Sequence, residues 1–310
     1  LARAYRQLQD LDRASVFARA ALELPAYKPA NFVTLAQTFR ATCDFDSLDR
    51  MGNIWENCSH LLPKHLPAVF LDLLVYARSR EDVLAFVALV RRWAKIVDKQ
   101  AETAPLPPMP ARRRAVGDKL RIGFLSSDLR SHSVSRFLVP LMQHYDRSRF
   151  SFNCYTPINA VGDALQVLIK DSVDTFTHVE NKSDFELAKI IRDDGIDMLF
   201  ELNGFPEATR LDCLAWRPAP VQISWLGYPF TCGLKALDHV ILDRFVQPPD
   251  PGFLTEEPIV MPEAWVCFGK FADVQIPLGL PLDRNGVVTF GTLNNPYKYN
   301  REVIALWARV

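Results

Sequence analysis

The pattern of hydrophobic and polar residues changes once along the chain, close to residue 110. Before that point, apolar residues recur at steps of three and four, as they do between Val83 and Val97, which is the spacing of a buried helix face. The pattern therefore predicts that residues 1–101 form helices only. Prolines, which break the interior of a helix, separate the predicted helical blocks at Pro25, Pro29, Pro63 and Pro67.

After residue 118, short apolar runs alternate with helical patterns. The runs predict strands at residues 119–127, 150–156, 196–202, 220–226, 238–243 and 287–293. The patterns between them predict helices at residues 134–145, 164–170, 183–194 and 300–310, and leave a short apolar piece at 174–179 unassigned. Strands that alternate with helices indicate parallel βαβ units, so we predict a doubly wound parallel sheet in this region.

The Pro-rich segment 102–118 separates the two regions and is expected to be an extended linker. In the first region, Tyr5, Ala14, Ala18 and Ala21 are spaced like the packing positions of a tetratricopeptide repeat. An ordinary helical hairpin is the alternative. Because such a repeat cannot bury its face alone, we expect further repeats before Leu1 in a longer parent protein.

Composition and charge exclude several classes of function. The 310 residues include 36 basic and 36 acidic side chains, so charge gives no reason to expect nucleic acid or an anionic membrane as a partner. No apolar run reaches the ~18 residues of a membrane-spanning helix, and no signal-peptide pattern is visible. The six cysteines are scattered without a CxxC pair, which argues against a disulfide framework or zinc cluster and predicts a cytoplasmic location.

Candidate chemistry follows from the predicted sheet, because ligands of parallel sheets bind beyond the carboxyl ends of the strands. The loop after strand 119–127 contains Asp128 and His132 and leads into a helix whose first N–H groups could face an anion. His132 is suited to move a proton or to hydrogen-bond a phosphate, and the alternative is a helix cap.

Three further loops follow predicted strands. Asn203 and Gly204 follow strand 196–202, and Gly227 lies in the segment WLGYPFTCG. These could be site residues or ordinary turn residues, since turns use glycine widely. Asn295, Tyr297 and Lys298 follow strand 287–293, where Lys298 could neutralise a phosphate or lie in an exposed turn. The motifs GxGxxG, GxxxxGK[ST] and GxSxG are absent.

Four segments together carry a resemblance to a known family. The segments are LRIGFLSSDLRSHSVSRF, DDGIDMLFELNGF, RPAPVQISWLGYPFTCG and FGTLNNPYKYN. Their order and spacing resemble those in the catalytic region of the protein O-GlcNAc transferase family, which includes Spindly-type O-fucosyltransferases. The resemblance covers residues 119–310. It implies a GT-B fold in which tetratricopeptide-like helices (1–101) and the linker (102–118) precede a first Rossmann-like domain (119–284), with the start of a second, truncated one at 285–310. Residues 1–310 by themselves are then expected to be inactive.

The resemblance also implies an activity. This is metal-independent, inverting transfer of GlcNAc from UDP-GlcNAc to Ser or Thr of protein acceptors, with no cofactor besides the nucleotide sugar. The helical repeats would bind the protein acceptors and could support oligomers. Two alternatives stay open. One is transfer of another sugar, such as fucose from GDP-fucose, and the other is a non-catalytic tetratricopeptide scaffold with a degenerate glycosyltransferase domain.

By motif match, the resemblance assigns roles to individual residues. His132 corresponds to a family histidine near the donor phosphates, and Lys298 to the lysine that neutralises the leaving diphosphate. The donor-contacting positions are Asn295, Tyr297 and Lys298. The positions in cleft loops on the acceptor side are Asp128, Asn203, Gly204, Gly227 and Tyr228.

Two departures from the family pattern leave the catalytic base and the sugar open. Lys189 and Arg192 stand where animal enzymes carry an Asp and a His, and Phe205-Pro206 stands where a Tyr-Thr or His-Thr pair is usual. The residues present still suit the implied reaction. Without a metal ion, the negative charge of the leaving diphosphate needs a lysine and the N–H groups at a helix N-terminus.

Overall fold

The structure is a computed structural model that describes residues 1–24, 29–109, 115, 117–205, 208–269 and 278–310. The chain forms two compact units. We call Leu1–His65, Asp72–Arg78 and Lys270–Val310 the helical unit, and Leu66–Leu71 with Ser79–Gly269 the sheet unit. Each unit is described by itself.

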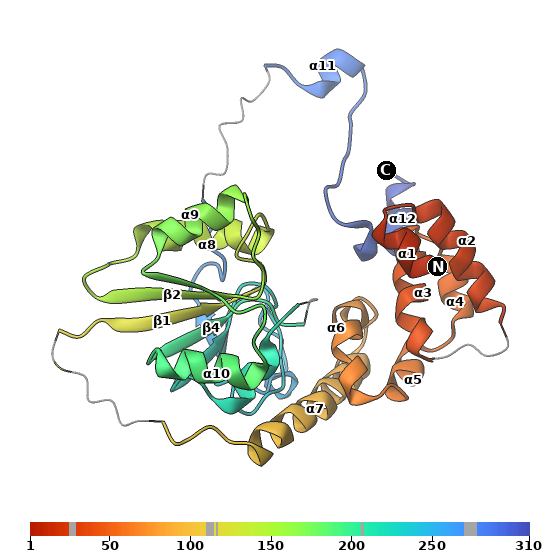
Figure 1. The fold of residues 1–310 in the computed structure, drawn as a ribbon. Helices are drawn as coiled ribbons and strands as arrows, with labels where there is room; N and C mark the ends of the chain where they lie inside the picture. The colour runs from red at the N-terminus through yellow and green to blue at the C-terminus, as the bar shows by residue number, and fades with distance from the viewer. Residues whose placement is uncertain (25–28, 110–114, 116, 206–207, 270–277) are drawn as a thin grey trace. The chain divides into compact units, whose positions relative to one another are not determined.

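The helical unit begins with short helices, as the hydrophobic pattern predicts. They are α1 (Ala2–Gln7), α2 (Leu11–Leu22), α3 (Pro29–Ala41), α4 (Phe45–Arg50), α5 (Ile54–Ser59), the 3-10 helix η1 (Pro63–His65) and α6 (Pro67–Leu74), which contributes residues to both units. Ala14 and Ala18 are completely buried, and Tyr5 stacks on Phe17 with ring centroids 5.3 Å apart. Small buried residues thus let α1 and α2 pack closely, at two of the predicted positions (Figure 1).

The C-terminal part of the helical unit holds α11 (Pro281–Asn285), η4 (Pro296–Lys298) and α12 (Arg301–Trp307). Helix α12 confirms the prediction for 300–310, but the predicted strand at 287–293 is wrong. Its apolar side chains, including Val287 and Phe290, are exposed, and no strand pairs with it among the described residues. A strand needs hydrogen-bonding neighbours, so an apolar run without them stays irregular.

The sheet unit contains seven parallel strands in the order β3-β2-β1-β4-β5-β6-β7. The strands are β1 (Leu120–Leu125), β2 (Phe150–Thr156), β3 (Thr175–His178), β4 (Met198–Glu201), β5 (Val221–Ser224), β6 (His239–Asp243) and β7 (Glu257–Met261). This arrangement confirms the predicted doubly wound sheet. The sequence pattern left β3 unassigned and missed β7, both of which are edge strands with a single neighbour.

Helices cover both faces of the sheet (Figure 1). Helices α8 (Ser133–His144) and α9 (Ala164–Ser172) lie on one face, and α10 (Asp184–Asp193) lies on the other. The core between the sheet and α8 includes Phe124, Leu138 and Met142, all nearly or fully buried. Burial on both faces explains why the central strands read as continuous apolar runs.

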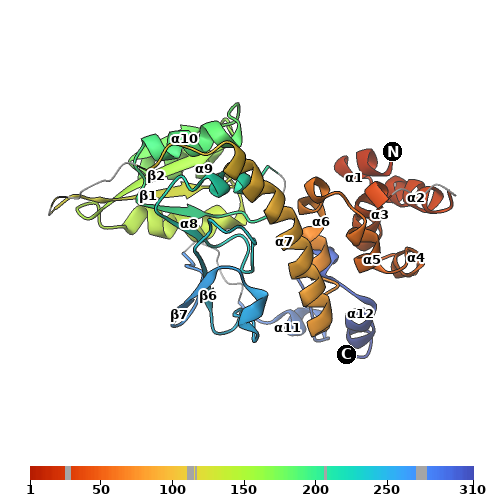
Figure 2. The same ribbon diagram turned by 90° about the horizontal axis from the view of Figure 1, so that it is seen from below.

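Helix α7 (Arg80–Thr103) packs within the sheet unit, although the sequence pattern grouped its residues with the N-terminal helices (Figure 2). Its apolar stripe is covered by loops of that unit. Val90 faces Gly233, where an added Cβ would lie 2.8 Å from Val90 Cγ1, and Trp93 packs edge-on against Phe205 at 5.3 Å. The predicted domain boundaries stay predictions. The division of the chain into compact units assigns α7 to the sheet unit.

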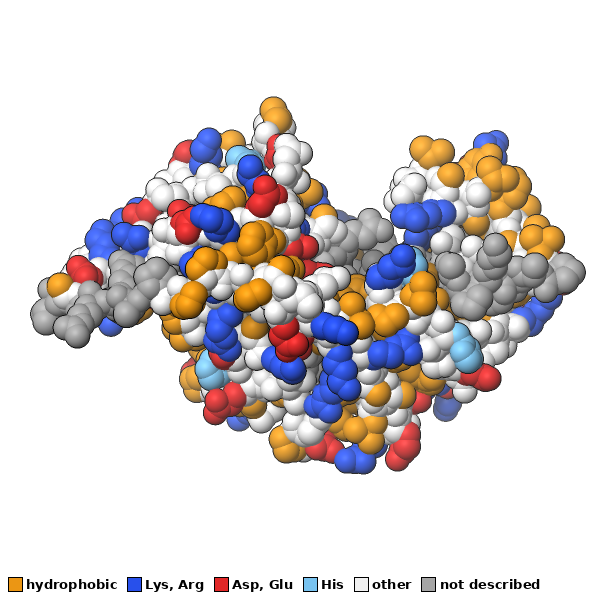
Figure 3. Space-filling model, turned by 60° about the horizontal axis from the view of Figure 1, so that its bottom comes forward, with side chains coloured by type: hydrophobic (Ala, Val, Ile, Leu, Met, Phe, Trp, Pro, Cys, Tyr) orange, Lys and Arg blue, Asp and Glu red, His pale blue; other side chains and the backbone are white. Residues whose placement is uncertain are grey.

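None of the described helices is both long and apolar enough to cross a membrane. On the face drawn in Figure 3, basic, acidic and apolar side chains are interspersed. This mixture is what equal numbers of acidic and basic residues lead one to expect.

Candidate functional site

The candidate site lies where the strand order reverses. From β1 the chain continues outward through β2 and β3 on one side, and β4 returns to pair with β1 on the other side. The loops that leave β1 and β4 therefore begin side by side at the carboxyl edge of the sheet. In open α/β sheets this switch point is where ligands bind.

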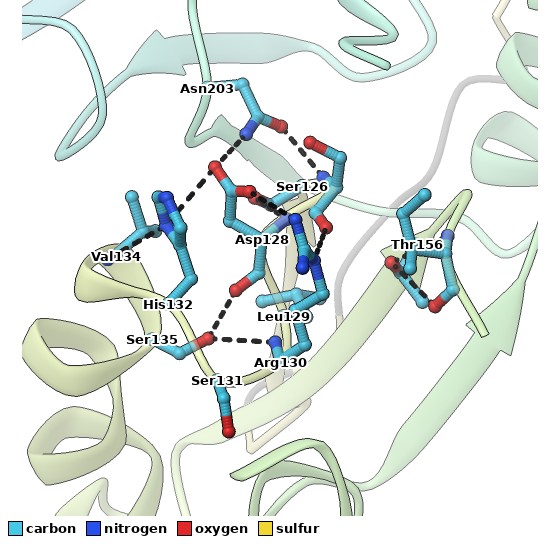
Figure 4. A network of polar contacts seen from close by, with 12 residues as sticks. Ser126, Asp128, Leu129, Arg130, Ser131, His132, Val134, Ser135, Thr156 and Asn203 are labelled. Carbon is cyan, nitrogen blue, oxygen red and sulfur yellow. Dashed lines mark hydrogen bonds and ion pairs between the residues drawn. The ribbon is translucent and has the colours of Figure 1, made fainter. Parts of the chain in front are cut away.

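Asp128 and Asn203 join these two loops directly (Figure 4). The Asn203 Nδ2 donates to Asp128 Oδ2 at 2.6 Å, and the Asn203 Oδ1 accepts from the Ser127 N–H at 2.8 Å. Asn203 is 2% exposed and Asp128 is 7% exposed. The hydroxyl of Ser135, in the first turn of α8, donates to the Asp128 carbonyl at 2.5 Å. Two predicted site residues thus form one buried network.

His132 caps the helix that follows this loop. Its Nδ1 accepts from the Val134 N–H at 3.3 Å and lies 3.5 Å from Asp128 Oδ2. The side chain is 40% exposed. While Nδ1 accepts the Val134 N–H, the neutral ring carries its proton on Nε2 and can donate it outward. For Nε2 to accept a proton, the ring must hold its proton on Nδ1, which faces the Asp128 carboxylate.

Glu201, the last residue of β4, is a member of the network that the sequence pattern did not single out. Its Oε1 accepts from the Asn203 N–H at 2.8 Å, and its Oε2 accepts from the Gly204 N–H at 2.9 Å. The side chain is 1% exposed. Burial raises the pKa of Glu201 to about 8; the two N–H groups act against this rise, and the nearby charge of Asp128 adds to it. An acidic residue that ends an apolar strand was the only signal in the sequence.

The two predicted glycines are needed for close packing of the loops. At Gly227 an added Cβ would lie 2.1 Å from the Leu202 carbonyl oxygen, and at Gly204, where φ is +73°, it would lie 2.4 Å from the Tyr228 Cβ. Tyr228 itself is 2% exposed. Its ring packs against Phe205 at 5.3 Å. In this structure Tyr228 therefore belongs to the packing behind the loops, and its side chain does not line their exposed surface.

We expect Tyr228→Phe to raise the free energy of unfolding by about 1 kcal/mol, because the buried Tyr228 hydroxyl has no hydrogen-bond partner among the described residues. The matched control is Tyr155→Phe. The Tyr155 hydroxyl, also buried, donates to Asp194 Oδ2 at 2.7 Å, so its removal should lower the free energy of unfolding by about 1 kcal/mol. Thermal and urea unfolding of both variants measure the difference. A loss of stability in Tyr228→Phe equal to that of the control would contradict the prediction.

The raised pKa of Glu201 predicts a pH dependence of stability. In the unfolded chain the carboxyl titrates near its usual 4.5, while in the folded chain it keeps its proton up to about pH 8. Between these values the unfolded chain binds fewer protons, so stability falls as pH rises from about 4.5 to 8, by on the order of a few kcal/mol. Glu201→Gln should flatten this fall. Urea unfolding at pH 5, 6.5 and 8 tests it, and equal pH slopes in both proteins would argue against it.

The remaining predicted site residues belong to the helical unit. Asn295 precedes η4, and Tyr297 and Lys298 lie within it. The Lys298 N–H donates to the Asn295 carbonyl at 3.0 Å, and the Lys298 side chain is exposed. Asn295 and Lys298 thus lie in a polar turn, which is one of the two possibilities that the sequence left open.

Two of the residues that depart from the family pattern, Lys189 and Arg192, lie on α10 and bond to groups away from the network. Arg192 lies near the end of α10, which leads to the amino end of β4, opposite the edge that carries Asp128. Its guanidinium donates to the backbone carbonyls of Pro107, Trp216 and Arg217. Lys189 pairs with Asp193 on the surface of the same helix. Phe205 is buried against α7, and Pro206 lies outside the described residues.

In the part of the chain that the structure describes, no three His, Cys, Asp or Glu side chains come together as metal ligands would. What the site offers is a half-exposed imidazole, a carboxylate held by an amide, and backbone N–H groups at the start of α8. These groups can hydrogen-bond a phosphate or a sugar hydroxyl and can exchange a proton with it.

A doubly wound parallel sheet with a polar network at its switch point places this chain among the α/β proteins that bind ligands at the carboxyl edge of the sheet. Comparison with known proteins gives the family. The model of glycosyl transferase family 41 matches residues 72–266. Because this match covers more than half of the chain, the chain belongs to glycosyl transferase family 41.

Individual relatives agree with this assignment. The chain is 33% identical over 196 residues to a probable UDP-N-acetylglucosamine–peptide N-acetylglucosaminyltransferase SPINDLY of Oryza sativa subsp. japonica, covering 62% of this chain and 21% of the relative. It is 28% identical over 247 residues to the similarly named SEC of Arabidopsis thaliana, covering 74% and 25%. A solved structure of a Thermobaculum terrenum O-GlcNAc transferase mutant has a TM-score of 0.76 at 26% identity, covering 98% of this chain and 56% of that one. The chain spans about a fifth to a quarter of the length of the curated relatives that it matches.

Proposed function

We propose that this chain is part of an enzyme that transfers a sugar from a nucleotide donor to Ser or Thr of protein acceptors, with GlcNAc from UDP-GlcNAc as the leading donor. The relatives' names support the reaction, since they describe UDP-N-acetylglucosamine–peptide transferases. The observation that carries the proposal for this chain is the network of Asp128, Asn203 and His132 at the switch point, in a member of family 41.

The proposed step is a single displacement. The acceptor hydroxyl attacks the anomeric carbon and gives up its proton to water or to a phosphate oxygen of the donor. The bond from that carbon to the diphosphate oxygen breaks, and the bonding electrons leave with the diphosphate. Attack from the opposite side inverts the anomeric centre. Lys298 would neutralise the charge of the leaving diphosphate, which removes the need for a metal ion. The nucleotide sugar is a substrate, and we propose no further cofactor.

His132 has two possible roles in this step, and its contacts favour one of them. While Nδ1 caps the helix at Val134, the proton on Nε2 suits a hydrogen bond to a phosphate oxygen of the donor. To take the proton of the acceptor hydroxyl, the ring would have to give up this cap and turn its Nδ1–H to Asp128. We therefore propose contact with the phosphate as the role of His132.

The test is a transfer assay with the natural full-length chain. Ser- and Thr-rich peptides are incubated with UDP-GlcNAc or with GDP-fucose, each with and without EDTA, and the products are identified by mass spectrometry and by the NMR coupling of the anomeric proton. We expect a β-linked GlcNAc product that survives EDTA. Fucose transfer would replace the proposed donor. Absence of transfer from both donors across a peptide library would favour a scaffold role, in which protein acceptors are only bound.

A further inference from the structure

The buried carboxyl of Glu201 calls for an explanation. Its contacts among the described residues are backbone N–H groups of its own turn, with no Lys or Arg side chain beside it. A buried carboxyl without a cation is costly, and the two N–H groups that it accepts offset only part of this cost, since its pKa stays raised. Such a cost at the switch point suggests that the residue serves the site rather than the stability of the fold.

We propose that Glu201 is a positioning residue of the site, which fixes the turn at residues 202–204 so that the Asn203 side chain spans both loops of the switch point. This inference rests on the proposed function, because it concerns how the site is held in its working geometry. Glu201 would touch neither donor nor acceptor.

The contacts form a short relay. The Glu201 carboxyl holds the Asn203 N–H at 2.8 Å, and this sets the direction in which the Asn203 side chain leaves the backbone. The Asn203 amide must then present its NH2 to Asp128 and its oxygen to the Ser127 N–H, an order that a shifted or flipped amide would reverse. The Asp128 Oδ2 in turn lies 3.5 Å from the His132 Nδ1. A change in the turn would therefore shift the Asn203 side chain, then the Asp128 carboxylate that it holds, and so alter the surroundings of the His132 ring.

Glu256 provides a matched comparison within the same unit. It is 3% exposed, burial raises its pKa, and it accepts the N–H groups of Cys232 and Gly233, each at 2.9 Å. Glu201 and Glu256 thus each hold a loop by accepting two backbone N–H groups. Among the described residues, Glu256 makes no contact with Asp128, Asn203 or His132. A role limited to stability predicts the same behaviour for both residues.

The experiment compares Glu201→Met, Glu201→Gln and Glu256→Met in the natural full-length chain. Steady-state kcat and KM are measured with UDP-GlcNAc and a peptide acceptor, and the midpoint of thermal unfolding is measured for each variant. We expect Glu201→Met to lower kcat by ~10-fold or more with KM for the donor changed by less than about threefold. Glu201→Gln, whose Oε1 still accepts both N–H groups, should stay within about twofold of wild type at pH 7. Glu256→Met should lose stability and keep kcat.

A second measurement applies if Glu201→Met does not fold. The titratable groups that face Glu201 are Asp128 on the loop after β1, Cys213 in the 3-10 helix η2 (Leu211–Trp216), and Cys232 after β5. When Glu201 loses its proton above about pH 8, its charge repels Asp128. The kcat of the wild type should then fall between pH 8 and 9.5, and Glu201→Gln should not show this fall.

The outcomes separate this inference from the proposed function. Equal kcat in Glu201→Met and Glu256→Met at matched stability, or identical pH profiles for wild type and Glu201→Gln, would overturn the positioning role while the wild-type transfer activity stands. If the wild type transfers no sugar, the proposed function fails, and the His132 ring signals in NMR spectra of residues 1–310 decide the positioning role. They should shift in Glu201→Met and stay in place in Glu256→Met, and no shift in either would overturn it.

Discussion

Replacing Lys298 by alanine is expected to lower kcat and kcat/KM together, by ~10²- to 10³-fold, the range that the loss of one preorganised charge or donor produces. The reason is that the diphosphate gains negative charge as it leaves, so a cation beside it acts most strongly in the transition state. UDP should also bind more weakly, because the product carries the same charge. Lys298→Arg should restore only part of the rate, since a planar guanidinium does not replace a compact ammonium in a fitted pocket.

The measurement combines steady-state kinetics of the full-length variants with calorimetric titration of UDP. Arg309→Ala is the matched control, because it removes another exposed positive charge of the helical unit, beyond the end of α12. It should leave both kcat and UDP affinity unchanged. If Lys298→Ala behaves like this control, Lys298 is only a turn residue and the scaffold alternative gains support.

Two substitutions at His132 separate its chemical role from its structural one. His132→Ala removes both the imidazole and the cap on the Val134 N–H, so it should lower kcat by ~10²-fold and destabilise the protein by about 1 kcal/mol. His132→Asn keeps an oxygen acceptor at the cap, because Asn is among the favoured N-cap residues. It should therefore keep the unfolding midpoint of the wild type and lose activity as severely as the Ala variant.

The pair of variants makes the two interpretations of His132 measurable. Kinetics and thermal unfolding are compared on the same preparations, with Ser131→Ala as a control in the adjacent exposed position. If His132→Asn retains wild-type kcat, capping of α8 accounts for the residue and the phosphate contact is refuted.

Much of the sheet unit could be predicted from the sequence, because buried strands and amphipathic helices have distinct periods. The ends of β1 and β4 follow from their apolar runs, so Asp128 and Asn203 could be named as site residues. That their side chains bond to each other could not be predicted, since it depends on the strand order. The role of Glu201 could not be predicted for a related reason. An apolar run does not show whether a carboxyl at its end faces water or bonds to the following turn.

The errors concern segments whose structure depends on neighbours. The edge strand β7 has only the short apolar run 259–261 between Pro258 and Pro262, and its side chains are largely exposed. A run that is short and bounded by prolines on both sides is typical of a loop. The run at 287–293 has the composition of a buried strand but has no pairing partner among the described residues. The composition of a segment indicates whether its side chains suit a sheet. Whether the segment forms a strand also depends on a neighbouring strand with which it can pair.

The packing of α7 has a consequence for how this protein can be divided and recombined. Trp93, Phe70 and Tyr228 all surround Phe205, which directly follows the turn held by Glu201. A repeat array exchanged at the Pro-rich segment 102–118 would remove Phe70 and Trp93, two of the three aromatic side chains that pack against Phe205. Exchange upstream of α6 would retain them. In chimeras that borrow acceptor specificity from another repeat array, the junction should therefore be placed before Pro67.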